Sequence, residues 1–206
     1  MVLVYLQLWD AQITWWLNHH LANPLFDIVM PLFDAQINWM GPLLVIMMGV
    51  IIWGKRKGRI AVLGAVILVS ITDYTSSGLL KPWVDRTRPC NILPELRVWI
   101  KGEGWMITPD PVDRIYRKSR SFPSGHATNS LAQALWWANI YPQIKIGVYL
   151  IALTIGLSRI YIGVHYMGDV VGGWLWGILW TMLMLGIART VLPQLLKPEA
   201  NDSSEK

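Results

Sequence analysis

Three residues that carry charge or titrate lie between two apolar stretches near the C-terminal end of the chain: Arg159, His165 and Asp169. Charge at membrane depth is costly unless it serves a function. His165 and Asp169 are four residues apart, so within a helix they would share a face and the carboxylate would reach the ring. An acid that orients an imidazole makes it a better base or nucleophile. The forked guanidinium of Arg159 is suited to phosphate.

A second pair of charges is Lys81 and Arg88, which is followed by Pro89. Their spacing of seven is nearly two helical turns, which predicts that both side chains lie on one face of a helix. Two cations that converge at the end of a span would neutralise the non-bridging oxygens of a phosphoryl group. Taken alone, the stretch also fits a juxtamembrane basic patch that contacts lipid headgroups.

A third stretch, Pro123-Ser124-Gly125-His126, precedes an apolar segment. Ser124 is predicted to cap a helix, which leaves the amides of Gly125 and His126 free to face an anion. Gly125 would let a phosphate approach the backbone, and His126 can protonate a leaving oxygen. Each stretch alone has a purely structural interpretation, but together they supply cations, two histidines and an orienting acid.

The composition indicates a membrane protein. The chain has 206 residues, of which 53% are hydrophobic and only 15% are charged, and it contains thirteen Trp. These values are typical of a small polytopic membrane protein, and no polar linker divides residues 1–196, so we expect one integral domain. The net charge of +5 arises from basic residues in loops, which favours anionic lipid or a phosphorylated substrate over nucleic acid. Cys90 is the only cysteine, so an intramolecular disulfide is excluded.

The predicted fold is an all-α bundle of five transmembrane helices that follow N-terminal interfacial helices. Residues 1–22 mix Trp with polar residues and residues 24–38 begin with Asn-Pro, so both pieces of 1–38 are expected to lie in the interface. The alternative is that 1–22 is a first span, which gives six. Residues 81–122 form a long polar loop, and 197–206 a disordered cytoplasmic tail. The five spans are predicted at 39–54, 60–80, 126–141, 146–164 and 169–188.

Counting spans places the three stretches together. The first two flank one loop with no span between them, and the third lies two spans later, so all three reach the same membrane face. The loop 55–59 has four Lys/Arg, which predicts a cytoplasmic location. Loop 81–122 carries nine Lys/Arg against five Asp/Glu, but the short, dense loop should dominate. The site and loop 81–122 are therefore predicted to be extracytoplasmic.

The three stretches resemble the signature of the type 2 phosphatidic acid phosphatase (lipid phosphate phosphatase) superfamily. That signature is Lys-x6-Arg-Pro, then Pro-Ser-Gly-His, then Ser-Arg-x5-His-x3-Asp, and each part is matched here, the third from Ser158 to Asp169. The order and the span count extend the resemblance over roughly residues 60–190. The first forty residues and the loop 90–120 are not covered.

The resemblance implies a mechanism with no metal and no cofactor. His165 would attack phosphorus and form a phosphohistidine, with Asp169 orienting it, and His126 would protonate the departing oxygen. Residues that would hold the phosphate oxygens are Lys81, Arg88, Ser124, Gly125 and Arg159.

The implied function is hydrolysis of a lipid phosphate or pyrophosphate in the inner membrane of a bacterium, with the site facing the periplasm or exterior. Candidate substrates are undecaprenyl pyrophosphate, phosphatidylglycerol phosphate, phosphatidic acid and the phosphate of lipid A. The expected partners are this substrate and membrane lipids, without nucleic acid. Two alternatives are a lipid phosphotransferase and a non-catalytic protein that binds or transports phospholipid.

Three further features call for interpretation. Asp73 lies eight residues before Lys81, ~12 Å along a helix, where it either pairs with a site cation or is satisfied by Tyr74, Thr75 and nearby serines. The small-residue spacing of Gly168, Gly172, Gly173 and Gly177 predicts a close helix contact. Loop 90–120 is either an interfacial lid that reads headgroups or a solvated anchor on anionic lipid; its basic and aromatic residues are Arg97, Trp99, Lys101, Trp105, Arg114, Arg117, Lys118 and Arg120.

Overall fold

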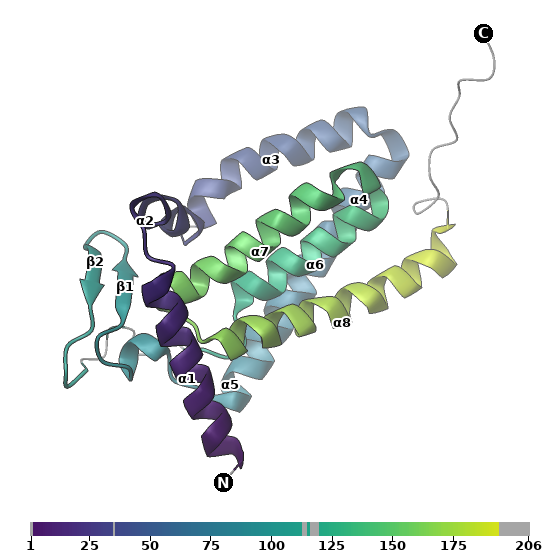
Figure 1. Cartoon of the computed structure of the whole chain (residues 1–206). Coiled ribbons are helices and arrows are strands. Elements are labelled where there is room, and N and C mark those ends of the chain that lie inside the picture. The colour runs from purple at the N-terminus through teal and green to yellow at the C-terminus, as the bar shows by residue number, and fades with distance from the viewer. Residues whose placement is uncertain (1, 35, 113–114, 116–119, 194–206) are drawn as a thin grey trace.

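The computed structural model describes residues 2–34, 36–112, 115 and 120–193 (Figure 1). The α-helices are α1 (Val2–His20), α2 (Pro24–Val29), α3 (Gln36–Trp53), α4 (Lys55–Asp73), α5 (Lys81–Val84), α6 (Gly125–Ile140), α7 (Lys145–Tyr161) and α8 (Met167–Val191). Short helical turns are η1 (Met30–Phe33), the π-helical η2 (Tyr74–Leu80), η3 (Pro89–Asn91) and η4 (Pro142–Ile144). The strands are β1 (Arg97–Ile100) and β2 (Gly104–Ile107).

The predicted helical membrane bundle is confirmed, with a helix in each of the five expected spans. Among the described residues, three helical segments are long and apolar enough to cross a membrane: Lys55–Val84, Pro142–Tyr161 and Met167–Val191. The first joins α4, η2 and α5 into one rod. In α3 the apolar stretch is the shorter Trp39–Trp53, and α6 has 16 residues. The number of spans therefore stays a prediction.

Helix α6 is the centre of the bundle, because it packs against α4, α7 and α8. The α8 contact depends on glycine. A Cβ at Gly173 would stand 2.6 Å from the carbonyl oxygen of Ser124, and one at Gly177 would stand 2.5 Å from that of Thr128. The predicted close helix contact is confirmed at these two positions, where the backbones approach too closely for any side chain.

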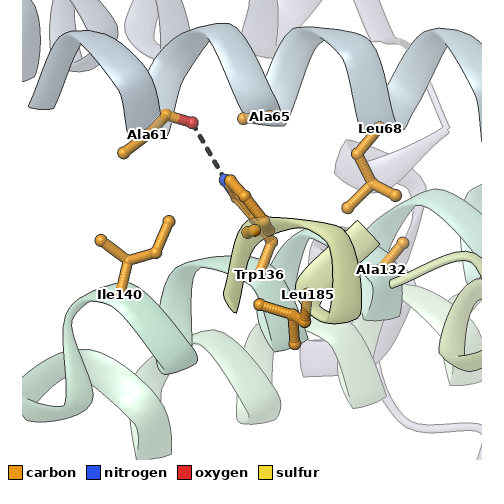
Figure 2. Packing of buried hydrophobic residues seen from close by; sticks show 8 residues of the cluster. Ala61, Ala65, Leu68, Ala132, Trp136, Ile140 and Leu185 are labelled. Atoms are coloured by element: carbon orange, nitrogen blue, oxygen red, sulfur yellow. Dashed lines mark hydrogen bonds between the residues drawn. The ribbon is translucent and has the colours of Figure 1, made fainter. Parts of the chain in front are cut away.

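Trp136 of α6 fills the space between α4 and α8 (Figure 2). Its ring is fully buried, and its indole Nε1 donates to the carbonyl oxygen of Ala61 at 2.9 Å. The surrounding side chains of Ala65, Leu68 and Leu185 are small or branched and leave room for the ring. A buried indole that has a partner for its N–H avoids the cost of an unsatisfied donor.

The two ends of the bundle differ. The turns between α3 and α4 and between α6 and α7 lie at one end, as does the C-terminal end of α8 (Figure 1). At the other end lie α1, α5, the hairpin and the turn from α7 to α8. The three chemically promising stretches all belong to this second end, as the span count predicts.

Loop 81–122 was predicted as a polar loop in an all-α fold, but it contains an antiparallel hairpin. Arg97 pairs with Ile107 and Ile100 with Gly104. The hairpin docks on the end of α7, since the amide of Trp99 donates to the carbonyl oxygen of Ile162 at 3.2 Å. Local residue patterns do not reveal such a short hairpin, because its register is set by what it packs against.

The hairpin contains several of the basic and aromatic residues of loop 90–120 that could read lipid headgroups. Arg97 forms an ion pair with Asp27 at 2.7 Å and lies over the ring of Trp105, and Trp99 and Trp105 pack against Tyr161 and its neighbours. These three side chains are thus engaged within the protein. The side chain of Lys101, at the tip, is exposed. Arg114, Arg117, Lys118 and the predicted tail 197–206 lie outside the described residues.

The close contact of α6 and α8 yields a matched pair of substitutions. Gly177→Ala places a methyl group against backbone, whereas Gly186→Ala, on the same helix, meets nothing within 4 Å. Overpacking typically costs about 1–3 kcal/mol, so Gly177→Ala should lower the thermal midpoint of the detergent-solubilised protein by several degrees. Gly186→Ala should leave it unchanged or raise it slightly. Equal midpoints for the two variants would contradict the packing described here.

Candidate active site

His165 lies in the turn that joins α7 to α8, and not within a helix as the spacing to Asp169 had implied. Helix α8 begins at Met167, and Asp169 belongs to its first turn. The predicted contact exists nevertheless, because the turn folds the ring back over the helix end. Nδ1 of His165 lies 3.4 Å from Oδ2 of Asp169, slightly longer than an ordinary hydrogen bond.

The carboxylate of Asp169 is completely buried, and each of its oxygens has a partner. Oδ2 accepts hydrogen bonds from the amide of Tyr166 at 2.9 Å and from the hydroxyl of Ser121. Oδ1 accepts from the guanidinium of Arg86 at 2.9 Å. A buried charge is tolerated when it is paired and hydrogen-bonded in this way. Asp169 can therefore hold the Nδ1 side of His165.

The opposite side of the imidazole faces Arg88. Nη1 of Arg88 donates to the carbonyl oxygen of Val164 at 2.9 Å and lies 3.4 Å from Nε2 of His165. Burial lowers the pKa of His165 to about 4, although the Asp169 carboxylate acts in the opposite direction. The ring is therefore neutral at physiological pH, and its Nε2 offers a lone pair beside a cation suited to phosphate.

Ser124 caps α6 as predicted, since its side chain accepts from the amide of Ala127. Its own amide donates to the carbonyl oxygen of Asp169 at 3.0 Å, which ties the start of α6 to the start of α8. Gly125 follows in the first turn, where an added Cβ would meet only the hydroxyl of Ser77, at 3.8 Å. The start of α6, which is predicted to bind an anion, therefore lies directly beside Asp169, the acid that faces the candidate nucleophile His165.

His126 is the second histidine of the site. Its Nε2 is buried and has no hydrogen-bond partner among the described residues. The ring interacts electrostatically with Arg159, His165, Lys81 and Arg88. Residues from all three stretches therefore converge on it, and its unsatisfied nitrogen is available to a ligand oxygen.

Lys81 and Arg88 do not share a helix face, so that prediction is wrong. Helix α5 ends at Val84, because Asp85 adopts a left-handed conformation with φ of 47°. Arg88 is extended, with ψ of 150°, as expected for a residue before proline. The two cations still interact electrostatically, and Asp73 acts on Lys81 with the opposite sign, as an attractive charge. The turn at Asp85 brings them together in place of a helix.

Arg159 is buried at the end of α7, and Nη1 donates to Oδ1 of Asp34 at 2.9 Å. Its Nε and Nη2 both donate to the hydroxyl of Ser158. Asp34 lies beyond η1, far away in sequence. The pairing fixes the guanidinium near His126, and each of its three nitrogens already donates to Asp34 or Ser158.

Sequence reasoning missed four residues that shape the site: Ser121, Arg86, Asp34 and Asp10. Ser121 contacts both Asp169 and His165, and Asp10 contacts Arg86. The available signal was the spacing of polar residues in the N-terminal segment, where Asp10, Thr14 and Asn18 recur every four residues. That spacing predicts one polar helix face, but not what the face binds.

The chain is similar to a family of known proteins and to individual members of it. A family model described as the PAP2 superfamily matches residues 60–192. The chain is 31% identical over 139 residues to phosphatidylglycerophosphatase B of Bacillus subtilis strain 168, covering 59% of this chain and 55% of that protein. It is 30% identical over 161 residues to a lipid A 4'-phosphatase of Porphyromonas gingivalis, covering 73% and 61%. The chain thus spans little more than half the length of these two relatives.

A solved structure shows the same fold. The crystal structure of a transmembrane PAP2-type phosphatidylglycerolphosphate phosphatase from Bacillus subtilis superposes with a TM-score of 0.64 at 24% identity. The superposition covers 91% of this chain and 88% of that chain. It therefore includes most of the N-terminal segment, which the family model leaves out.

The protonation state of His165 can be measured directly. In protein labelled with ¹³C at histidine Cε1, the signal absent from His165→Gln should keep the shift of a neutral imidazole down to about pH 5, because burial disfavours the imidazolium. His20→Gln, which alters an exposed histidine, should leave that signal in place. A titration midpoint near the ordinary value of ~6.5 would contradict the described environment.

Proposed function

The chain belongs to the PAP2 superfamily, and from that premise we propose that it is a lipid phosphatase that acts through a phosphohistidine intermediate. The observation that carries the proposal is the placement of the two nitrogens of His165. Nδ1 faces the buried carboxylate of Asp169, while Nε2 faces the guanidinium of Arg88. An oriented imidazole with its free nitrogen beside a cation is the arrangement that attack on phosphorus requires.

In the first step Nε2 of His165 attacks phosphorus in line, and a bond between nitrogen and phosphorus forms as the bond to the lipid oxygen breaks. The departing oxygen takes the electron pair and a proton from His126. The anionic phosphoryl group itself favours the protonated form of His126. The Asp169 carboxylate stabilises the positive charge that develops on the imidazole of His165.

In the second step water attacks phosphorus and gives up a proton to His126. The bond between nitrogen and phosphorus breaks, inorganic phosphate leaves and His165 is restored. Throughout, Lys81, Arg88 and Arg159 neutralise the phosphoryl oxygens, and the amides at the start of α6 bind them. Charge stabilisation by fixed groups is usually the largest contribution to catalysis, and here protein cations would provide it without a metal ion.

The substrate is proposed to be a lipid phosphate or pyrophosphate of the cell envelope. The names of the two relatives support phosphatidylglycerol phosphate and lipid A as candidates, beside undecaprenyl pyrophosphate and phosphatidic acid. The apolar character of α4, α7 and α8 supports a lipid, because the site lies at the end of helices that are long and apolar enough to cross a membrane.

A phosphate-release assay with the purified protein and these four lipids tests the proposal. At least one lipid should be hydrolysed, and His165→Ala should lower turnover by more than about 10³-fold, because it removes the nucleophile. His126→Ala should lower it by roughly 10²–10⁴-fold, because it removes the general acid. His20→Ala, an exposed histidine outside the site, is the matched control and should retain full turnover.

The same assay separates this mechanism from a metal-dependent one. Turnover should survive EDTA, because the cations of the site are side chains, and it should be inhibited by vanadate, which adopts the geometry of the phosphoryl group in transfer. Loss of turnover with EDTA that added divalent metal restores would overturn the mechanism.

We also propose that the protein lies in the bacterial inner membrane with the site facing the periplasm or exterior. The support is the basic start of α4, residues 55–59, which lies at the opposite end of the bundle from the site. The hairpin, with Lys101 at its tip, lies at the site end.

Cysteine labelling in intact cells tests this orientation. In a Cys90→Ser background, Lys101→Cys should react with a membrane-impermeant maleimide, whereas Arg56→Cys should react only after the cells are permeabilised. Both positions are exposed, so accessibility reports the side of the membrane. The reverse labelling pattern would place the site in the cytoplasm.

A further inference from the structure

Arg86 lies between two carboxylates that are far apart in the sequence. Its Nη1 donates to Oδ1 of Asp169 at 2.9 Å, and its Nη2 donates to Oδ2 of Asp10 at 2.7 Å. The guanidinium also stacks on the ring of Tyr166, with Cζ 3.9 Å from the ring centroid. Both ends of the fork and one face of its plane are therefore engaged within the protein.

Arg86 and Arg88, only two residues apart, thus act on opposite sides of the His165 imidazole. Arg88 approaches Nε2 of His165, where the phosphoryl group is proposed to bind. Arg86 approaches the far oxygen of Asp169, whose other oxygen faces Nδ1 of His165. Because Arg86 is held between carboxylates, its charge is directed at the acid and not at the phosphate.

Helix α1 holds the partner of Arg86. Oδ1 of Asp10 accepts from the amide of Gly168 at 2.7 Å, and the hydroxyl of Thr14 accepts from the amide of Met167 at 2.9 Å. One turn further, the side-chain amide of Asn18 donates to the carbonyl oxygen of Tyr161 at 2.7 Å. The polar face of α1 therefore satisfies backbone groups at the two helix ends that flank His165.

This arrangement explains why polar residues recur in an otherwise apolar and Trp-rich helix. Donors at the start of α8 and acceptors at the end of α7 have no partner within their own helices. Asp10, Thr14 and Asn18 supply those partners from a single face, and α1 packs against both helices beside the α7–α8 turn (Figure 1). The helix is thus a brace for the turn that carries His165.

We infer that Arg86, held by Asp10 of α1, is a positioning residue that fixes the carboxylate of Asp169 against Nδ1 of His165. The inference rests on the proposed function and names a group outside the phosphate-binding set. Without Arg86, Oδ1 of Asp169 would be a buried oxygen with no partner, and the carboxylate would rotate to find one. The imidazole would then lose its fixed orientation, and a misplacement of about 1 Å can lower the rate roughly 10²-fold.

The decisive experiment compares kcat and KM for Arg86→Ala, Arg86→Lys and the control Arg56→Ala, an exposed arginine at the opposite end of the bundle. Arg86→Ala should lower kcat about 100-fold with KM changed less than about threefold, since no phosphate contact is lost. Guanidinium chloride at tens of millimolar should restore at least about a tenth of the lost kcat, by refilling the space between the carboxylates. Arg86→Lys should retain more activity than Arg86→Ala, because it keeps the charge but not the fork.

Asp10→Asn supplies a second measurement in case Arg86→Ala folds poorly. It keeps the size of the side chain and should lower kcat about tenfold. In the double variant with Arg86→Ala it should add little, because the two residues act through one interaction. Vanadate should raise the thermal midpoint of each variant, which shows that the phosphate-binding side is intact.

Three outcomes would overturn the inference: a kcat for Arg86→Ala above about one third of wild type, a loss that falls in KM and not in kcat, or additive losses in the double variant. Failure of the wild type to hydrolyse any lipid phosphate would instead contradict the proposed function. If the wild type and Arg56→Ala hydrolyse the lipid normally, the proposed function stands, and the result for Arg86→Ala tests the positioning role alone.

Discussion

A negative charge that is wholly buried, on Asp169, constrains the rest of the structure. Burying an ionised carboxylate costs several kcal/mol unless charged and polar groups surround it. Here they come from the turn before α8, from the loop before α6 and from Arg86 beyond α5. Satisfying this one side chain therefore draws together segments that are distant in the sequence, and His165 is held where they meet.

The same constraint separates the two sides of the imidazole. On the Nδ1 side, partners are fixed and buried, so the ring has one orientation. Arg88 lies on the Nε2 side. The ring of His126 interacts electrostatically with that of His165, and its buried Nε2 has no hydrogen-bond partner among the described residues. A site of this kind places fixed cations and hydrogen-bonding groups where the ligand is proposed to bind, which is how fixed groups come to favour charge in a transition state.

Much of this could be predicted from the sequence, because spans and caps are local signals. Runs of apolar residues located the membrane helices, the cap at Ser124 was recognisable, and the span count placed the three stretches at one end. The left-handed turn at Asp85 was not predictable, since it depends on tertiary contacts that override helix propensity. The partners of Arg86 depend on contacts across 76 or more residues, and the hairpin docks on residues that are also distant in the sequence. Local sequence patterns carry no information about such contacts.

The N-terminal segment shows this limit most clearly. Its Trp-rich, apolar character predicts an interfacial helix, and the exposed rings of Trp9 and Trp16 agree with that interpretation. Its polar residues, however, bind the helix ends around His165, and Asp34 pairs with Arg159. A segment outside the family match thus supplies carboxylates that hold Arg86 and Arg159.

The most direct test of the account is to trap the covalent intermediate. Protein mixed with a ³²P-labelled lipid phosphate and quenched in alkali should carry a label that is stable to base and labile to acid, located by peptide mapping on His165. The label should form no more slowly than phosphate is released, and it should be absent from His165→Ala. Steady turnover without any such label, or a label on another residue, would contradict the account.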